Sequence, residues 1–399
     1  MPLQLARFDP SSFDFPRPKV PLLPNRTVSS GNGIPITGFF KTTQYGFRSF
    51  ARGRYALGAA YRLCGIGPEK ILMAPAYHCL SMLDPAIALG AKVLLYPLRP
   101  DLSPDIEKFD ALFAKADRPV SALLATHYFG LAQNFVPLRS WCAAKGITLI
   151  EDCSHVLFTE TVQAPRTGTF GKYVTASPYK FFACEDGGLL CAAEPGLLGM
   201  TVVESPSWRD EARGFKHLME MRRPPPLANT GSASTAHPLP AETPLFELAY
   251  GRPSPYFVPA DARKSALRLS RWLVRRASVH DLAAARRRNY ARWLDATATL
   301  PNCLPLYPDW PADGVPYMFP LLIDTPLPHF FLLKQAGMPI WRWDEMAISD
   351  CPVSRRYQLH LLHLPCHQGL DEAQMDWMID VLRSVLRRTG EDGCREAGR

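Results

Sequence analysis

Residues 54–152 alternate between helix-like and strand-like segments. Four short runs are apolar along almost their whole length: 70–74, 92–96, 120–126 and 147–151. The segments that precede them place apolar side chains at helical spacing, over 54–64, 81–89, 104–116 and 136–145. Strands that are apolar on both faces are typical of a parallel sheet that is covered on both sides. The alternation therefore predicts an α/β domain in which helices sandwich a mostly parallel sheet.

This alternation stops near residue 205, and the rest of the chain differs in texture. A length of 399 residues is enough for two domains. Many of the 39 prolines cluster near the N-terminus, between 224 and 260 and between 301 and 328, which indicates loops rather than a repeat. Five segments are predicted: an N-terminal arm (1–45), the α/β domain (46–205), a Pro/Ser-rich excursion (206–260), a smaller C-terminal domain (261–390) and a polar tail (391–399).

Cysteine usage and hydropathy exclude several classes of protein. The ten cysteines form no Cys-x-x-Cys pair, and the chain has no His-Glu-x-x-His, so we expect neither a disulfide framework nor a metal site. The N-terminus lacks the apolar core of a secretory signal. No stretch approaches the roughly 18 apolar residues of a membrane span. We therefore expect a cytoplasmic protein without a membrane partner.

The chain carries a net charge of +8, and much of the excess lies between Arg263 and Arg292. Alanine and leucine interleave with these arginines at helical spacing, which predicts a helix with a solvated basic face. A patch that attracts a phosphorylated substrate is the alternative. Nucleic acid is not an expected partner, because no recognition module accompanies the charge.

Asp152 and Lys180 are the strongest candidates for chemistry. Asp152 follows the apolar run 147–151, and Lys180 lies in the apolar segment 179–182. A carboxylate at the C-terminal end of a buried strand and a lysine in an apolar turn suit pyridoxal phosphate (PLP). The carboxylate keeps the pyridine nitrogen protonated, and the lysine forms the Schiff base. A helix-capping aspartate and a surface lysine are the structural alternatives.

Short motifs surround this pair in a fixed order. They are Arg52-Gly53-Arg54-Tyr55-Ala56-Leu57, Gly65-Ile66-Gly67-Pro68, Pro75-Ala76-Tyr77-His78-Cys79, His127-Tyr128-Phe129-Gly130, Ile150-Glu151-Asp152-Cys153-Ser154-His155, Gly168-Thr169-Phe170-Gly171, Asp186-Gly187-Gly188 and Leu364-Pro365-Cys366-His367-Gln368. Together they resemble the DegT/DnrJ/EryC1/StrS aminotransferase family, which has the aspartate-aminotransferase fold (fold type I). The resemblance implies a mostly parallel, seven-stranded-type sheet in the large domain and a smaller α+β C-terminal domain.

The resemblance also assigns expected roles to individual residues. Lys180 would hold PLP and move protons, and Asp152 would pair with the ring nitrogen. His155 matches a position close to the cofactor's phenolic oxygen, although a structural histidine is the alternative.

The phosphate of PLP is expected at a helix start. Gly53 would let the backbone approach closely, and Arg54 would supply a guanidinium where the family commonly has a hydroxyl. Thr175 matches the family's phosphate-contacting position, with Ser177 as a second candidate. A purely structural turn around Gly53 is the alternative reading.

The residue that covers the PLP ring is left open. Cys79 matches the usual stacking position but is not aromatic, so His78 or Tyr77 is expected to replace it. His127 is as compatible with a structural role as with a functional one.

Two departures from the family weaken any transfer of substrate specificity. The family's Gly-Tyr-Asn segment, whose Asn reaches the neighbouring subunit's phosphate, corresponds here to residues 254–259, which lack that Asn. The turn after Lys180 also differs from the common Lys-Asn-Leu form. Acceptor choice is expected to depend on the excursion, on residues 341–343 and on a partner subunit.

The resemblance implies a homodimeric PLP-dependent aminotransferase. It would move an amino group from an amino acid, by resemblance L-glutamate, to a keto group of a nucleotide-linked sugar in polysaccharide or secondary-metabolite biosynthesis. A PLP-dependent sugar dehydratase is one alternative, which Lys180 disfavours because the family's dehydratases have His there. A non-catalytic or regulatory relative of the same fold is the other.

Overall fold

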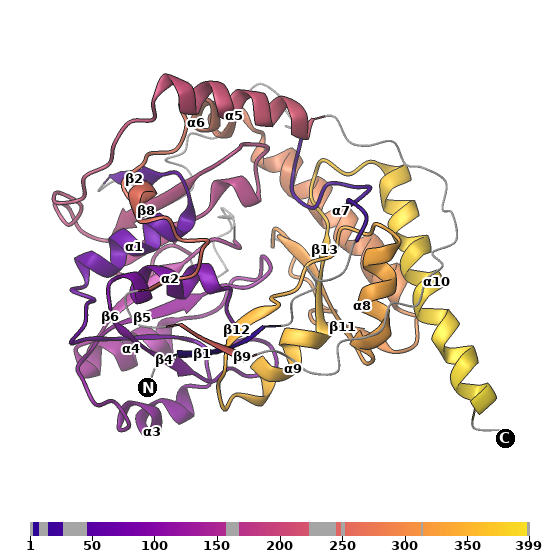
Figure 1. Ribbon diagram of the computed structural model, residues 1–399, viewed down its shortest axis with the longest axis horizontal. Helices are drawn as coiled ribbons and strands as arrows, with labels where there is room; N and C mark the ends of the chain where they lie inside the picture. The colour runs from indigo at the N-terminus through magenta and orange to yellow at the C-terminus, as the bar shows by residue number, and fades with distance from the viewer. Residues whose placement is uncertain are drawn as a thin grey trace.

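The computed structural model describes residues 3–7, 15–26, 46–156, 167–222, 245–248, 252–312 and 314–396. A larger α/β part lies at the left of Figure 1, and a smaller part from the C-terminal third of the chain lies at the right. Within the described ranges, no helix is both long and apolar enough to cross a membrane.

The larger part is built on a seven-stranded sheet. From one edge to the other its strands are β2 (Phe47–Phe50), β8 (Gly188–Ala192), β7 (Tyr173–Ala176), β6 (Thr148–Asp152), β5 (Val120–Thr126), β3 (Ile71–Pro75) and β4 (Lys92–Tyr96). The strands from β7 to β4 pair in parallel, whereas β8 is antiparallel to both of its neighbours. The mostly parallel α/β sheet expected from the sequence is confirmed.

Helices cover both faces of this sheet. Helices α1 (Gly53–Leu63) and α2 (Leu80–Ala88) pack in one core with strand residues such as Leu72. Helices α3 (Phe109–Phe113) and α4 (Val136–Lys145) pack in a second core with alternate strand residues such as Met73. Successive side chains of a strand point to opposite faces, so strands that are apolar throughout supply both cores.

Helix α4 ends at the position expected from the sequence. Gly146 adopts a left-handed conformation with φ of 69°, and its N–H bonds the carbonyl of Ala143. Glycine takes this conformation without the steric penalty that a Cβ would bring, which is why it ends so many helices. The chain turns directly from here into β6, the strand that carries Asp152.

The smaller part contains a three-stranded antiparallel sheet. Strand β11 (Met318–Ile323) lies between β10 (Cys303–Pro305) and β13 (Leu361–Pro365). Helices α7 (Val279–Thr297), α8 (Pro326–Gln335) and α10 (Glu372–Glu396) share its apolar core, which includes Trp293, Phe319 and Met378. Helix α10 extends beyond residue 390, where the sequence predicted a polar tail.

The predicted arm and excursion contribute to regular structure. Strand β1 (Leu3–Arg7) lies between β9 (Leu245–Leu248) and β12 (Glu345–Ala347). Helix α5 (Trp208–Met221) also falls inside the predicted excursion and begins with a capping box between Ser207 and Asp210. Helices α6 (Arg268–Arg276) and α9 (Pro352–His360) complete the described elements.

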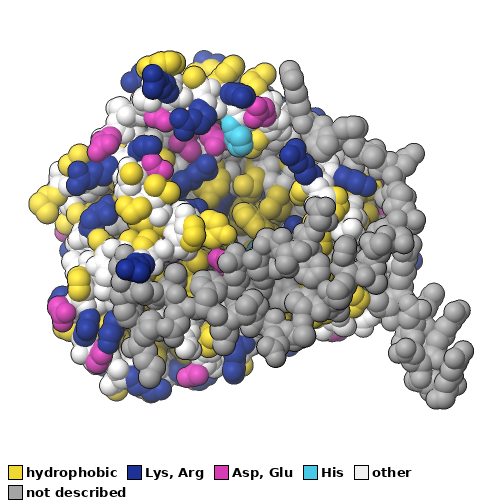
Figure 2. All heavy atoms as spheres, in the orientation of Figure 1, with side chains coloured by type: hydrophobic (Ala, Val, Ile, Leu, Met, Phe, Trp, Pro, Cys, Tyr) yellow, Lys and Arg dark blue, Asp and Glu magenta, His cyan; other side chains and the backbone are white. Residues whose placement is uncertain are grey.

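The basic segment is divided between surface and interior. Lys and Arg side chains are spread among acidic and hydrophobic ones on the face in Figure 2. Arg275, Arg276 and Arg288 are exposed, as the solvated basic face requires. Arg286 is fully buried, so the prediction of a solvated face is wrong at this position.

Candidate active site

Asp152 lies at the carboxyl end of β6, where ligands bind in sheets of this kind. Its carboxylate is almost fully buried and accepts hydrogen bonds from the Ser154 N–H at 3.0 Å and the Thr175 hydroxyl at 3.2 Å. Thr126 of β5 is in register beside it, and its buried hydroxyl has no hydrogen-bond partner among the residues that the structure describes. The carboxylate is therefore held in place, with unsatisfied polar capacity next to it.

Lys180 ends a short turn, Pro178–Lys180, that follows β7. Its side chain is partly buried, and Nζ lies 5.5 Å from the centre of the Tyr317 ring. Phe181 and Phe182, which follow in the chain, are almost fully buried. The apolar surroundings expected from the sequence are present.

One pocket brings these two residues together. Its space between atoms is about 420 Å³, a volume that includes open solvent. Six site candidates from the sequence line this pocket: Gly53, Arg54, Asp152, His155, Ser177 and Lys180. The other lining residues are Arg52, Leu57, Cys79, Ser81, Met82, Thr126, Ser154 and Tyr179. The lining thus combines a carboxylate, a lysine and a helix N-terminus.

The N-terminus of α1 suits a phosphate group. The helix begins at Gly53 without a side-chain cap, so its first N–H groups are available to an anion. A Cβ at Gly53 would lie 2.1 Å from the Ser177 hydroxyl, which in turn bonds the Ser154 hydroxyl at 2.9 Å. Glycine leaves a cradle there that two hydroxyls border.

The two hydroxyls expected near the phosphate lie in different surroundings. Thr175 lies within β7, where its hydroxyl donates to Asp152. Ser177 lies beyond the end of the strand and faces the pocket. The Arg54 guanidinium also lines the pocket but donates a hydrogen bond to the carbonyl of Tyr256. Ser177 is therefore better placed for an anion than Thr175.

His155 forms one wall of the pocket. Its ring stacks on Tyr317, with centres 4.4 Å apart and planes 30° apart. Burial, followed by the charge of Lys180 and by His363, lowers the pKa of His155 well below its usual value, so its ring is neutral. Its buried Nδ1 has no partner within the described structure. Together with the Thr126 hydroxyl and the glycine cradle, this atom makes the residues fit PLP.

His78 does not face the pocket. The Ala347 N–H donates to its Nε2 at 3.1 Å, so Nδ1 carries the proton and lies near the carbonyls of Pro75 and Ala76. Burial lowers the pKa of His78 to about 4. Both nitrogens are occupied by backbone groups, which favours a structural role over ring stacking. Cys79 is the residue of this loop that lines the pocket.

An aromatic cluster beside the pocket was not anticipated from the sequence. The Tyr77 hydroxyl bonds Nε2 of His363 at 2.9 Å, and the rings of Tyr77 and Trp343 lie 4.4 Å apart. Trp343 also contacts His155, at 6.0 Å between ring centres. Burial, followed by Lys180, lowers the pKa of His363 to about 3. Tyr77, Trp343 and His155 fell in segments that the sequence had singled out, whereas His363 did not.

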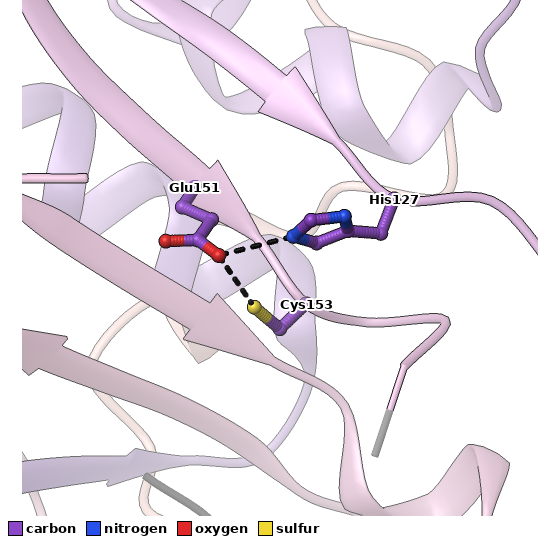
Figure 3. A group of neighbouring side chains, drawn as sticks. All are labelled: His127, Glu151 and Cys153. Atoms are coloured by element: carbon purple, nitrogen blue, oxygen red, sulfur yellow. Dashed lines mark hydrogen bonds and ion pairs between the residues drawn. The ribbon is translucent and has the colours of Figure 1, made fainter. Parts of the chain in front are cut away.

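His127 belongs to a buried group with Glu151 and Cys153 (Figure 3). The Gln133 N–H donates to its Nδ1, so Nε2 carries the proton and donates to Glu151 at 3.0 Å. Glu151 also accepts hydrogen bonds from the Cys153 thiol and from the backbone of residues 168–171.

These contacts favour an anchor rather than a metal site. Burial alone would raise the pKa of Glu151, but hydrogen bonds from His127, Gly168 and Phe170 lower it overall. The carboxylate is therefore ionised, and its oxygens are engaged by N–H groups. It fastens residues 168–171 to the end of β6, next to Asp152.

Comparison with known proteins finds a family match over the part of the chain that contains the pocket residues. Residues 48–216 match the model of the DegT/DnrJ/EryC1/StrS aminotransferase family. A dTDP-4-dehydro-2,3,6-trideoxy-D-glucose 4-aminotransferase from Saccharopolyspora spinosa is 28% identical over 149 residues, which cover 36% of this chain and 37% of the relative. GDP-perosamine synthase from Vibrio cholerae is 26% identical over 143 residues, which cover 35% and 38%. The chain thus aligns with less than two fifths of either curated relative.

Solved structures extend the likeness in fold over most of the chain. The PMP form of the putative sugar aminotransferase Spr1654 from Streptococcus pneumoniae has a TM-score of 0.59 at 13% identity. The alignment covers 92% of this chain and 98% of that one. Residues 48–216 are therefore similar to the DegT/DnrJ/EryC1/StrS aminotransferase family, and the chain shares the fold of a solved sugar aminotransferase over most of its length.

Proposed function

We propose that this chain is a PLP-dependent aminotransferase. It moves an amino group from an amino acid, L-glutamate by resemblance, to a keto group of a nucleotide-linked sugar. The observation that carries the proposal is a single pocket lined by Asp152, Lys180 and the N-terminus of α1. When bound, PLP supplies the electron sink that stabilises negative charge at the Cα of an amino acid.

The start of α1 would hold the phosphate. The N–H groups at Gly53 and Arg54 and the Ser177 hydroxyl would donate to it, and the positive end of the helix dipole would favour its charge. Gly53 matters here because a Cβ at this position would lie 2.1 Å from the Ser177 hydroxyl.

Asp152 holds a proton on the ring nitrogen. The hydrogen bonds from Ser154 and Thr175 orient its carboxylate and leave the other oxygen, Oδ2, for this interaction. His155 lies on the same side of the pocket, and its unpartnered Nδ1 is placed to meet a polar group of the cofactor. Its low pKa keeps it neutral, so it adds no charge there.

Lys180 is both the attachment point and the proton carrier. Its Nζ would take a proton from the Cα of the amino acid and deliver it to the C4′ carbon of the cofactor, which keeps the amino group. The aromatic faces of Tyr317 and His155 exclude water beside it.

The finer assignments rest on the relatives. Both curated relatives carry names that refer to amino sugars, one with a dTDP and one with a GDP prefix, which supports a nucleotide-linked sugar as acceptor. A role in polysaccharide or secondary-metabolite biosynthesis and a cytoplasmic homodimer complete the proposal. Light scattering of the purified protein would give the oligomeric state.

The acceptor is tested by a screen. Enzyme loaded with pyridoxamine phosphate is mixed with keto-sugar nucleotides and, as comparison, with simple keto acids. Mass spectrometry should detect an amino sugar nucleotide in stoichiometric amount. Reaction with keto acids alone would refute the sugar acceptor while leaving transamination intact.

A further inference from the structure

Arg286 is a fully buried cation close to the pocket. It lies on α7, and its side chain has no exposed surface. Burial lowers its pKa to about 10, so the guanidinium is still charged at neutral pH. Within the described ranges, no carboxylate lies at ion-pair distance from it. A buried charge without a counter-ion is costly unless hydrogen bonds satisfy it.

The hydrogen bonds of Arg286 use its full donor capacity. A guanidinium has five N–H donors. Nε donates to Oε1 of Gln368 at 2.8 Å. Nη1 donates to the carbonyls of Pro316 at 2.9 Å and Tyr317 at 3.1 Å. Nη2 donates to the carbonyls of Lys180 at 3.2 Å and Phe181 at 3.4 Å.

These acceptors come from three separate segments. They are the turn that carries Lys180, the residues before β11 and the residues after β13. The amide of Gln368 also donates to the Phe181 carbonyl at 2.7 Å, and the guanidinium lies 4.7 Å from the Phe181 ring. A single side chain of the smaller part therefore fixes the Lys180 turn of the larger part.

The same group also fixes Tyr317. The Tyr317 ring stacks on His155 and faces Nζ of Lys180. Holding both main-chain carbonyls sets the position of Lys180 relative to this ring. A substrate carboxylate is not the partner of Arg286, because every N–H is engaged and the side chain is buried.

We propose that Arg286 is a positioning residue for Lys180: its guanidinium clamps the Lys180 turn against Tyr317 and so sets where Nζ meets the carbonyl carbon of PLP. This inference rests on the proposed function for the identity of the cofactor. Lysine cannot replace Arg286, because an ammonium has three donors and no planar fork.

The test follows attachment to Lys180 rather than turnover. Nζ adds to the aldehyde carbon of PLP, water leaves, and borohydride then delivers hydride to the C=N bond and fixes a stable secondary amine. Peptide mass spectrometry of quenched samples gives the rate at which Lys180 is modified. We expect Arg286→Lys to slow this rate by about ten-fold or more, since small misplacements of a reacting group cost that much.

Arg287→Lys is the matched control. Arg287 is the next residue of α7, is half-buried and lines a separate surface hollow with Trp310. In the Arg287→Lys protein, Lys180 should be modified at the wild-type rate. Circular dichroism and thermal midpoints establish that both variants fold. A folded Arg286→Lys protein with the wild-type rate overturns the inference.

A second variant and the wild-type protein distinguish the remaining outcomes. If Arg286→Lys does not fold, Gln368→Met decides, because it removes only one acceptor of Arg286 and one donor to Phe181. It should slow modification by about three-fold, and an unchanged rate overturns the inference. The wild-type protein could also fail to transfer an amino group while the variants still show slow modification of Lys180. This result would refute the proposed function but not the positioning role. A wild-type protein in which Lys180 is never modified would refute both.

Discussion

At the scale of single residues, Asp152 and Lys180 meet because β6 and β7 are parallel neighbours. Asp152 is opposite Thr175, and Lys180 lies a few residues beyond it, so both side chains reach the same edge of the sheet. The local motifs singled out this pair, and the two residues line one pocket. They could not separate Thr175 from Ser177, because that difference depends on where β7 ends. Tyr317 and His363 were not predicted, because no local spacing links them to Lys180.

Asp152→Asn tests the carboxylate. The change keeps the size of the side chain and an oxygen that can accept from Ser154, but it removes the charge that holds a proton on the cofactor's ring nitrogen. We expect kcat to fall by on the order of 10²–10³-fold. Single-turnover rates with L-glutamate give the measurement. Asp376→Asn, at an exposed ion pair with Arg292, is the control and should retain activity.

At the scale of elements, apolar runs were more informative than helical texture. The expected runs at 120–126 and 147–151 correspond to β5 and β6 within one residue, because buried strands must be apolar. The predicted helix at 104–116 is wrong in length: a 3-10 turn precedes α3, and Phe109 is the only buried residue of either. Helix α5 was missed because it buries only Gly214 and Leu218. Its capping box was the available signal.

Gly53→Ala tests the N-terminus of α1. The added methyl would lie 2.1 Å from the Ser177 hydroxyl and would displace this proposed phosphate donor. We expect the Kd for PLP to rise by about ten-fold or more, corresponding to about 1.4 kcal/mol. Fluorescence titration of apo-protein measures it.

The double variant Gly53→Ala/Ser177→Ala makes this prediction sharper. Removing the hydroxyl leaves only an ordinary contact, at 3.5 Å from the Ser177 Cβ. The Kd of the double variant for PLP should therefore rise by less than the product of the two single-variant increases. Strict additivity of the two binding losses would argue against the steric account.

At the scale of the whole molecule, the smaller part packs against His155, a residue that lines the pocket. The smaller part supplies Tyr317 and Trp343 to ring contacts with His155 of the larger part. Such contacts between distant segments follow from the packing of the complete fold and not from local sequence patterns. They bury several neutral histidines at this junction and nearby: His78, His155, His363 and His367.

These histidines predict a loss of stability in acid. Burial lowers the pKa of His363 and of His367 to about 3, below the value near 6.5 of an unfolded histidine. Below about pH 6.5 the unfolded chain therefore binds more protons, and the free energy of unfolding decreases as the pH falls. Each histidine contributes up to about 1.4 kcal/mol per pH unit.

Urea unfolding between about pH 7 and pH 5 measures this effect. The His367→Gln variant lacks one titrating group and should show a shallower pH dependence than the wild type. His280→Gln is the control, because His280 is exposed, and it should leave the slope unchanged. Equal slopes in all three proteins would show that buried histidines do not govern acid stability.

The central claim is that Lys180 carries out amino transfer with PLP. The most direct measurement mixes PLP-loaded enzyme with L-glutamate and follows both the visible band of the bound cofactor and the 2-oxoglutarate released. The wild type should lose the band and release one equivalent per site. Lys180→Ala should lack the lysine-bound band and release 2-oxoglutarate more slowly by on the order of 10²–10⁴-fold. Wild-type rates in the folded Lys180→Ala protein would contradict the account.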